Sequence, residues 1–497
     1  MKSRYLSSFL NGLNPAFSLW LGLALLLCFY LVTLPFFALL VHNDLGWHIA
    51  TGDLIRATRA IPQVDPWSYT ANGHPWINLA WAWDIASSLV YEVGGLEYMH
   101  MLTFAFGGVC FLLVRQLGLK LGGVPWVASL AALLALAIVP FYGLPDIFFS
   151  ASPQLASYVL ILLFLLICHG QPSYWLLPLL SLIWVNVHNS FPLGLVILGL
   201  YAVVALVRKD FQRFQRFVII GILALAATFI NPYGINAHAL VIRTFGHISQ
   251  AHISEWQAFH TLLSGSFPYS VGPVILFFLI YCFTLVRAWR NEIKLPIELL
   301  ILSVLLLVLS CLQYRYASIW VLVSAPLLVL SQTESSPQTS TLRNGAIAIS
   351  IYLIALFLIM PAYMRKEYQA GMSLAPFRYP ANALQFIATH YPQARVANHW
   401  NYGTWMILYH REQMRPMIDG RALTAYPDEL FLKHYQKDND ASALSWENLL
   451  TEYPSDIILW MAADHKQIKA LKALRDWQTI YSDDIAVVFG PAIKSPK

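Results

Sequence analysis

The feature that most constrains this chain is its series of long apolar segments. A helix of ~20 apolar residues is long enough to cross a lipid bilayer. The chain has 497 residues, of which 58% are hydrophobic and 11% charged, whereas soluble domains average about 25% charged. The sequence therefore predicts a polytopic α-helical membrane protein. Its expected spans, about eleven, lie near residues 16–41, 98–114, 123–140, 154–169, 174–187, 191–207, 217–231, 270–286, 295–312, 317–331 and 344–362.

Lysine and arginine are concentrated in alternate loops between these segments. The basic positions are Lys2 and Arg4, Arg115 and Lys120, four residues within 208–216, three within 287–294, and Arg343. Because loops rich in these residues stay in the cytoplasm, the N-terminus is predicted to be cytoplasmic. An odd number of spans then places the chain after residue 363 outside. The basic residues thus indicate membrane orientation, and we expect no nucleic-acid partner.

The pattern predicts two domains. Residues 1–375 form a transmembrane domain that includes a first external loop at 42–83, and residues 376–497 form a small extracytoplasmic α/β domain. In this second domain, predicted strands at 394–399, 415–419 and 456–461 alternate with helices, and two closing strands follow at 478–489. This order favours some parallel pairing through right-handed crossovers. All five cysteines lie in apolar runs, so no disulfide framework and no cysteine metal site is expected.

The first external loop opens with a polar stretch at the edge of the first span. Asp44, His48 and Asp53 stand there, where an ionisable group is costly to place and is a functional candidate by default. We expect a helix at 44–59, in which Asp44 and His48 share one side because they are four residues apart. The alternative is that Asn43 or Asp44 simply caps this helix.

Other polar groups interrupt the apolar pattern at predicted external positions. Asn186 and His188 separate two apolar runs, Arg243 and Glu255 lie in the loop at 232–269, and Arg315 lies in a tight turn between two spans. Irregular backbone at membrane depth must be buried in protein or line a wet cavity. Helix capping and turn chemistry are the alternative for the first two of these groups.

Arg315 runs against the bias of this chain, because its other short external loops are poor in lysine and arginine. A phosphate partner would offset the cost of placing a guanidinium there through charge-assisted, often bidentate bonds. The alternative is an anchor to lipid headgroups or a structural ion pair. In the external region, Asp419 and Arg421 flank Gly420 at a predicted strand end, which indicates either a ligand-binding crevice or a salt-bridged turn.

Several motifs along most of the chain carry a family resemblance. They are Asp44-Leu-Gly-Trp47-His48 with Thr51-Gly52, Asp65-Pro-Trp-Ser68-Tyr69-Thr70, Trp184-Val-Asn186-Val-His188, Asn231-Pro-Tyr-Gly234, Glu255-Trp256 and Asp419-Gly-Arg421. Together they resemble a family of bacterial multispan proteins with a glycosyltransferase-C (GT-C) type architecture. The GT-C superfamily includes oligosaccharyltransferases, protein mannosyltransferases and aminoarabinose transferases.

The resemblance implies transfer of a sugar from a polyprenyl-phosphate-linked donor to an envelope acceptor. The reaction would take place at the periplasmic face of a bacterial inner membrane, with membrane lipid around the donor. The essential acid of the first external loop matches Asp44, and His48 is the second catalytic candidate. The candidates for substrate binding are Trp47, Asp53, Asn186, His188, Arg243, Glu255, Arg315, Asp419 and Arg421.

The sequence departs from the family pattern at three positions. His42 stands where a second acid is usual, Gly46 where tryptophan is usual, and Ser152 where arginine is usual. The missing acid weakens the case for a two-carboxylate metal site. We therefore predict no metal ligands and leave the cofactor open, because a divalent metal ion is compatible with the sequence but not required by it.

Two functions from other classes fit the same pattern. One is a transporter or flippase for a lipid-linked glycan, although such proteins often show internal repeats, and no convincing repeat is present here. The other is a non-catalytic assembly factor for envelope glycans, in which the C-terminal region binds a partner protein.

Overall fold

The computed structural model describes residues 15–33, 44–138, 151–170, 173–244, 247, 256–263, 268–331, 379–439 and 441–492. The chain divides into two compact units. We call residues 1–37, 97–234 and 253–363 the helical unit, and residues 38–96, 235–252 and 364–497 the α/β unit. Residues 42–83, which the sequence predicts as a first external loop, thus belong to the same unit as the C-terminal region. The domain boundary predicted at residue 375 lies outside the described residues.

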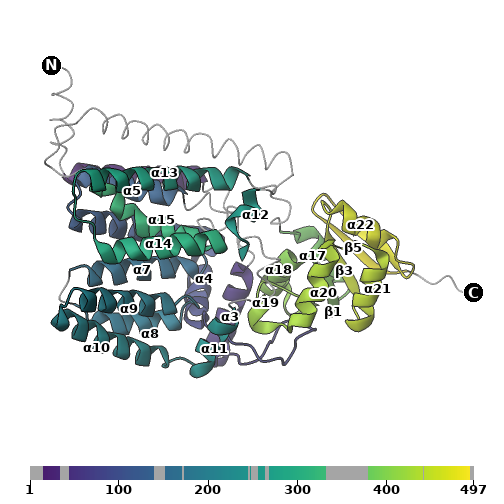
Figure 1. Ribbon diagram of the computed structural model, residues 1–497. Coiled ribbons are helices and arrows are strands. Elements are labelled where there is room, and N and C mark those ends of the chain that lie inside the picture. The colour runs from purple at the N-terminus through teal and green to yellow at the C-terminus, as the bar shows by residue number, and fades with distance from the viewer. Residues whose placement is uncertain are drawn as a thin grey trace, which may run out of the picture. The chain divides into compact units, whose positions relative to one another are not determined.

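The helical unit is a bundle of apolar helices (Figure 1). It contains α2 (Pro15–Thr33), the second part of α4 (Trp81–Lys120), α5 (Pro125–Ile138), α7 (Gln154–Cys168), α8 (Leu176–Val185), α9 (Pro192–Val207), α10 (Phe211–Thr228), α12 (Phe259–Leu263), α13 (Pro268–Arg290), α14 (Ile297–Leu312), α15 (Tyr316–Ser324) and a 3₁₀ helix, η5 (Ala325–Ser331). Helix α10 packs on α8 and α9, and α14 packs on α15.

Ten apolar helices in the described ranges bear on the predicted membrane spans. Three are long and apolar enough to cross a membrane, within Trp81–Lys120, Phe211–Thr228 and Gly272–Arg290. Seven others are apolar but have only 10 to 17 residues. The predicted span at 344–362 lies outside the described residues, as does the end of the span at 16–41. A membrane protein with apolar helices is thus supported, and the number of eleven spans stays a prediction.

Helix α4 contains non-helical backbone at Gly94 and Gly95. Gly95 has φ 64° and ψ −151°, a conformation that is essentially restricted to glycine because a Cβ would clash with the backbone. These two glycines immediately precede residue 97, where the helical unit resumes in the sequence.

The α/β unit contains a five-stranded mixed sheet with helices packed against it (Figure 1). The strands are β1 (Ala394–Asn398), β2 (Met414–Pro416), β3 (Ile457–Met461), β4 (Trp477–Ser482) and β5 (Ala486–Pro491), and the helices are α3 (Leu45–Thr58), the first part of α4, α11 (Ile235–Thr244), α17 (Ala381–His390), α18 (Trp400–His410), α19 (Ala422–Ala425), α20 (Asp428–Asn439), α21 (Ala443–Glu452) and α22 (His465–Lys472).

The strand order is β2-β1-β3-β5-β4. Strand β1 pairs in parallel with β2 and β3, whereas β5 is antiparallel to β3 and β4. The central strands β3 and β5 are buried along nearly all their length, which is why they read as continuous apolar runs and not as alternating patterns. The five strands lie within three residues of the ranges expected from the sequence.

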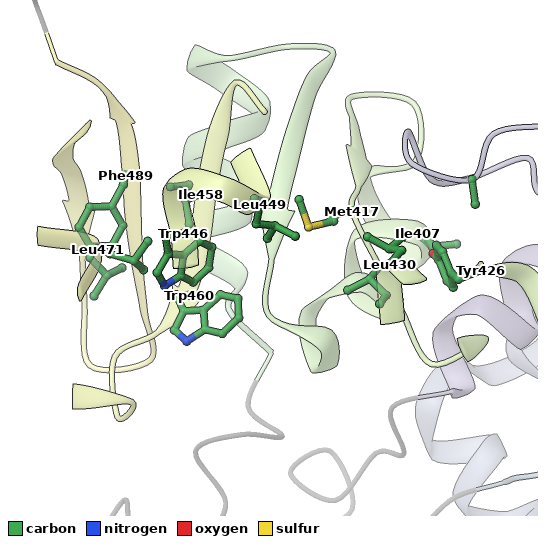
Figure 2. Packing of buried hydrophobic residues seen from close by; sticks show 14 of the residues in the cluster. Ile407, Met417, Tyr426, Leu430, Trp446, Leu449, Ile458, Trp460, Leu471 and Phe489 are labelled. Carbon is green, nitrogen blue, oxygen red and sulfur yellow. The ribbon is translucent and has the colours of Figure 1, made fainter. Parts of the chain in front are cut away.

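Part of the first external loop packs into the core of this sheet. Trp47 and Ala50 of α3, and Ala71 and Trp76 of the following loop, belong to one buried cluster with residues of the C-terminal region. Figure 2 shows the C-terminal members, among them Trp446 and Trp460, whose rings meet edge to face with centroids 4.9 Å apart. The loop and the C-terminal region therefore share a hydrophobic core.

The loop after α3 turns at Gly73, which has φ 79°. The backbone pairs across this turn: Trp76 N–H donates to Gln63 O at 2.9 Å, and Asp65 N–H donates to His74 O at 2.9 Å. This pairing brings Asp65 to the start of the turn.

A buried ionic cluster joins this turn to the sheet. The guanidinium of Arg421 donates from Nη1 to Asp65 Oδ1 at 2.6 Å, from Nε to Asp419 Oδ1 at 2.8 Å and from Nη2 to Asp419 Oδ2 at 2.7 Å. Tyr426 OH donates to Asp419 Oδ2 at 2.5 Å, and the guanidinium carbon lies 4.8 Å from the centre of the Trp76 ring. The side chains of Asp65, Asp419 and Arg421 are all fully buried.

The charges in this cluster stabilise each other. Burial alone would raise the pKa of Asp65, but the charge of Arg421 and hydrogen bonds from Ser68 and the Trp67 backbone hold this pKa below its usual value. Burial likewise opposes the charged form of Arg421, and the two carboxylates hold its pKa well above the usual value. Removing one partner from such a group leaves an uncompensated buried charge.

We predict that Arg421→Leu lowers the free energy of unfolding of the α/β unit by on the order of 3–5 kcal/mol, because two buried carboxylates lose their common partner. The matched control is Arg395→Leu. Arg395 also makes a two-bonded ion pair, with Asp456, but both side chains are 46% exposed, so this change should cost at most about 1 kcal/mol. Thermal unfolding of the full chain in detergent measures both. Equal shifts for the two variants would contradict a stabilising role of the buried cluster.

Candidate functional site

Asp44 lies directly before α3, at the position of its N-cap. Its side chain makes no capping hydrogen bond, so the alternative that the Asp44 carboxylate caps this helix is wrong; Asn43 lies outside the described residues. Asp44 Oδ1 instead accepts a hydrogen bond from the indole Nε1 of Trp47 at 3.1 Å. The carboxylate is half-buried, and the indole holds it in one orientation.

The backbone of Gly420 forms a wall against this carboxylate. A Cβ atom added to Gly420 would fall on Asp44 Oδ1 and would lie 3.4 Å from Trp47 Nε1. Asp419 and Arg421, on either side of Gly420, are locked in the buried ionic cluster. The cluster therefore fixes the backbone that touches Asp44.

Close contact between α3 and α18 supports the same arrangement. Trp47 N–H donates to Thr404 Oγ1 at 3.1 Å, and a Cβ at Gly46 would clash with the backbone carbonyl of Thr404. A Cβ at Gly403 would likewise clash with the backbone carbonyl of Ile418. Glycines at these positions allow the loop, α18 and the Asp419–Arg421 turn to meet at backbone distance.

His48 forms a buried pair with Asp84 of α4. The distance from His48 Nδ1 to Asp84 Oδ1 is 2.5 Å, and Asn78 Nδ2 donates to Asp84 Oδ2 at 2.6 Å. The imidazole lies against the indole of Trp47, with ring centroids 3.6 Å apart. One continuous set of contacts thus runs from Asn78 through Asp84, His48 and Trp47 to the Asp44 carboxylate.

Helices α3 and α4 meet in a parallel register that explains this pairing. His48 contacts Asp84, and Arg56 contacts Glu92, each 36 residues further along the chain. A Cβ at Gly52 would clash with the carbonyl of Asp84, so the two helices approach closely at this level. The small residue at position 52 allows the short contact of His48 with Asp84.

The other predicted site residues of the α/β unit make contacts of their own. Asp53 accepts from Ser88 Oγ at 2.6 Å and lies 3.4 Å from Arg411 Nη2, in a partly exposed group of charges. Arg243 is exposed in the last turn of α11. Asp419 and Arg421 are fully buried, which agrees with the salt-bridged turn left open by the sequence. Direct substrate contact by any of these residues stays a prediction.

The remaining predicted residues lie in the helical unit. Asn186 Nδ2 donates to Leu182 O at 2.8 Å and to Ile230 O at 3.0 Å, and so joins the ends of α8 and α10. His188 Nδ1 lies 2.8 Å from Ser157 Oγ and 2.7 Å from Ser190 Oγ. Arg315 stacks on Trp256, with 4.6 Å from the guanidinium carbon to the ring centre. Glu255 lies outside the described residues.

Sequence reasoning missed Asp84, Asn78 and the role of Gly420. A signal existed for Asp84, because a lone acid among Trp81, Trp83 and apolar residues at a helix start is a candidate for a buried, paired carboxylate. Among the described residues, no three His, Cys, Asp or Glu side chains gather as a metal site.

Comparison with solved structures identifies the architecture, whereas no protein-family model and no curated protein sequence matches the chain. The archaeal oligosaccharyltransferase AglB from Archaeoglobus fulgidus, in complex with an inhibitory peptide and a dolichol-phosphate, matches with a TM-score of 0.54 at 13% identity over 89% of this chain and 69% of that chain. The Archaeoglobus fulgidus oligosaccharyltransferase in complex with zinc and sulfate matches with a TM-score of 0.55 at 13% identity, over 88% and 68%.

ArnT from Cupriavidus metallidurans, bound to undecaprenyl phosphate, matches with a TM-score of 0.53 at 12% identity. The match covers 96% of this chain and 99% of that chain, so the two chains share nearly their whole length. AglB and ArnT are GT-C-type glycosyltransferases. At these identities the likeness concerns the fold, and it agrees with the resemblance carried by the sequence motifs. The chain therefore has a GT-C-type membrane fold.

Proposed function

We propose that the protein is a membrane glycosyltransferase. It moves a sugar from a polyprenyl-phosphate-linked donor to an envelope acceptor at the periplasmic face of a bacterial inner membrane, and Asp44 is its catalytic base. The observation that carries the proposal is the half-buried Asp44 carboxylate, held by the Trp47 indole and the Gly420 backbone within a GT-C-type fold. A fold hosts many functions, so the site and not the architecture has to support the chemistry.

The proposed reaction needs one proton acceptor and one stabiliser of negative charge. A hydroxyl or amide of the acceptor attacks the anomeric carbon, the bond from this carbon to the phosphate oxygen breaks, and the lipid phosphate leaves. The proton of the attacking group passes to the Asp44 carboxylate. A positioned general base of this kind contributes ~10²–10⁴-fold to the rate, and a fixed orientation of the carboxylate is what makes the transfer efficient.

Arg315 is the proposed contact to the donor phosphate. Its guanidinium carbon lies over the indole of Trp256, 4.6 Å from the ring centre. The Tyr314 N–H donates to Gln257 O at 2.9 Å, which holds this segment beside the turn. A stacked guanidinium keeps its N–H groups at the edge of the plane, where they can form two parallel bonds to phosphate oxygens. The charge that develops on the leaving phosphate would be stabilised there.

We predict that Asp44→Asn reduces sugar transfer by ~10²–10⁴-fold while expression and thermal stability stay near those of the parent. Asparagine keeps the shape and the bond from the Trp47 indole but cannot accept the proton. The assay is transfer from lipid-linked sugar by purified protein in lipid nanodiscs. Asp456→Asn is the control, because it removes an exposed acid at the sheet.

The Asp44→Asn variant also distinguishes the transferase from a flippase and from a non-catalytic assembly factor. A flippase should move lipid-linked glycan across vesicles without consuming it, and an assembly factor should tolerate Asp44→Asn in cells. Unaltered pools of polyprenyl-linked sugar in a deletion strain, together with full transfer by Asp44→Asn, would sink the proposal.

We predict that Gly420→Ala impairs transfer at least ~10-fold, since even small displacements of a catalytic group are costly, and does so mainly through kcat. The new methyl group occupies the place of Asp44 Oδ1 and must displace the carboxylate. Gly108→Ala is the matched control, since a Cβ at Gly108 meets no atom within 4 Å. Kinetics of both variants at saturating donor test this. Normal kcat in Gly420→Ala would show that the position of the Asp44 carboxylate does not matter.

We predict that Arg315→Lys weakens donor binding ~10-fold or more, because lysine keeps the charge but loses the planar, two-bonded geometry. Thermal stability should change little. Binding of a labelled polyprenyl-phosphate sugar to the purified variant gives the affinity. A headgroup anchor would tolerate lysine, so donor affinity equal to that of the parent in both Arg315→Lys and Arg315→Gln would refute the phosphate contact.

A further inference from the structure

The hydrogen bonds around the His48–Asp84 pair indicate which of the two side chains is the donor. Asn78 determines which way the hydrogen bonds run. Its Oδ1 accepts from Ala80 N–H at 3.1 Å, which orients the amide so that Nδ2 faces and donates to Asp84 Oδ2 at 2.6 Å. Asp84 therefore uses one oxygen as an acceptor for Asn78, and its other oxygen meets His48 Nδ1.

We propose that Asp84 and Asn78 fix the tautomer of His48, with the proton on Nδ1 and the lone pair on Nε2. Of the two ring nitrogens, the one that carries the proton is set by the partner of the other. Asp84 is fully buried, and Asn78 donates to one of its oxygens. As a carboxylate, Asp84 accepts at the other oxygen as well, so Nδ1 acts as the donor. Among the residues that the structure describes, none forms a hydrogen bond with Nε2.

This tautomer determines which substrate faces His48. A lone pair on Nε2 accepts a hydrogen bond from a hydroxyl or amide, and it repels a phosphate oxygen, which is itself an acceptor. The structure therefore assigns His48 to the sugar acceptor and not to the donor phosphate. Asp84 and Asn78 are positioning residues, because they act through His48. This role, unlike the tautomer itself, rests on the proposed transferase function.

The chain offers an isosteric test of the tautomer. In Asp84→Asn, the Asn78 amide still donates to position 84, so the new amide oxygen turns toward Asn78. The new NH₂ group then points at Nδ1 and forces the proton to Nε2. Adding Asn78→Asp reverses this, because the carboxylate at position 78 accepts from the NH₂ group and the amide oxygen turns back to Nδ1–H.

The experiment measures the tautomer directly, by ¹⁵N NMR of the full chain with labelled histidine in nanodiscs. His48→Gln identifies the His48 signals among the 15 histidines. We expect a protonated Nδ1 in the parent, a protonated Nε2 in Asp84→Asn, and a protonated Nδ1 again in the double variant. A parent spectrum with the proton on Nε2 would overturn the proposal, even if no variant folds.

Transfer kinetics test the positioning role. We expect Asp84→Asn to raise the KM for the acceptor and to lower kcat/KM ~10²-fold, with donor affinity unchanged, and we expect the double variant to recover most of this loss. A merely structural role would not predict rescue, because both variants change buried groups of equal size. Switched tautomers without any change in transfer would refute the positioning role. If the parent transfers no sugar at all, the proposed function fails while the tautomer assignment stands on the spectra.

Discussion

The folded structure of the α/β unit depends on the ion pairs of the buried Arg421 guanidinium. It binds Asp65, 356 residues earlier in the chain, and Asp419, two residues away. A charge without a partner at this depth is strongly destabilising, so the folded state requires the turn of the first external loop to lie on the edge of the sheet. Trp76 and Tyr426 close the cluster with their rings.

Much of the architecture could be predicted from local patterns in the sequence. Apolar runs indicate the membrane helices, and the five strands follow from short apolar segments between turn signals. The contact between Asp65 and Arg421 could not be predicted, because no sequence pattern near either residue indicates a partner 356 residues away. The need for glycine at position 420 could not be predicted either. It follows from the Asp44 carboxylate, which lies against the Gly420 backbone and leaves no room for a Cβ atom.

The candidate site was predictable where the chemistry of one residue suffices. An acid at the first membrane edge draws attention to Asp44, and a spacing of four adds His48. Asp84 required more, because its role depends on the register of α3 against α4 and on the orientation of the Asn78 amide. The expected N-cap alternative for Asp44 fails for a related reason: the indole of Trp47, three residues away, takes the carboxylate instead.

The buried ionic cluster and the Asp44 carboxylate meet at the backbone of Gly420. Within the cluster, Asp65 and Asp419 both bind the guanidinium of Arg421. Asp44 lies against residue 420, next to that same arginine in the sequence, and its Oδ1 accepts a hydrogen bond from the Trp47 indole. Because Asp65 and Asp419 already bind the guanidinium at three nitrogens, its charge is committed to them. The arginine thereby positions the backbone at Asp44 through its bonds to two other carboxylates.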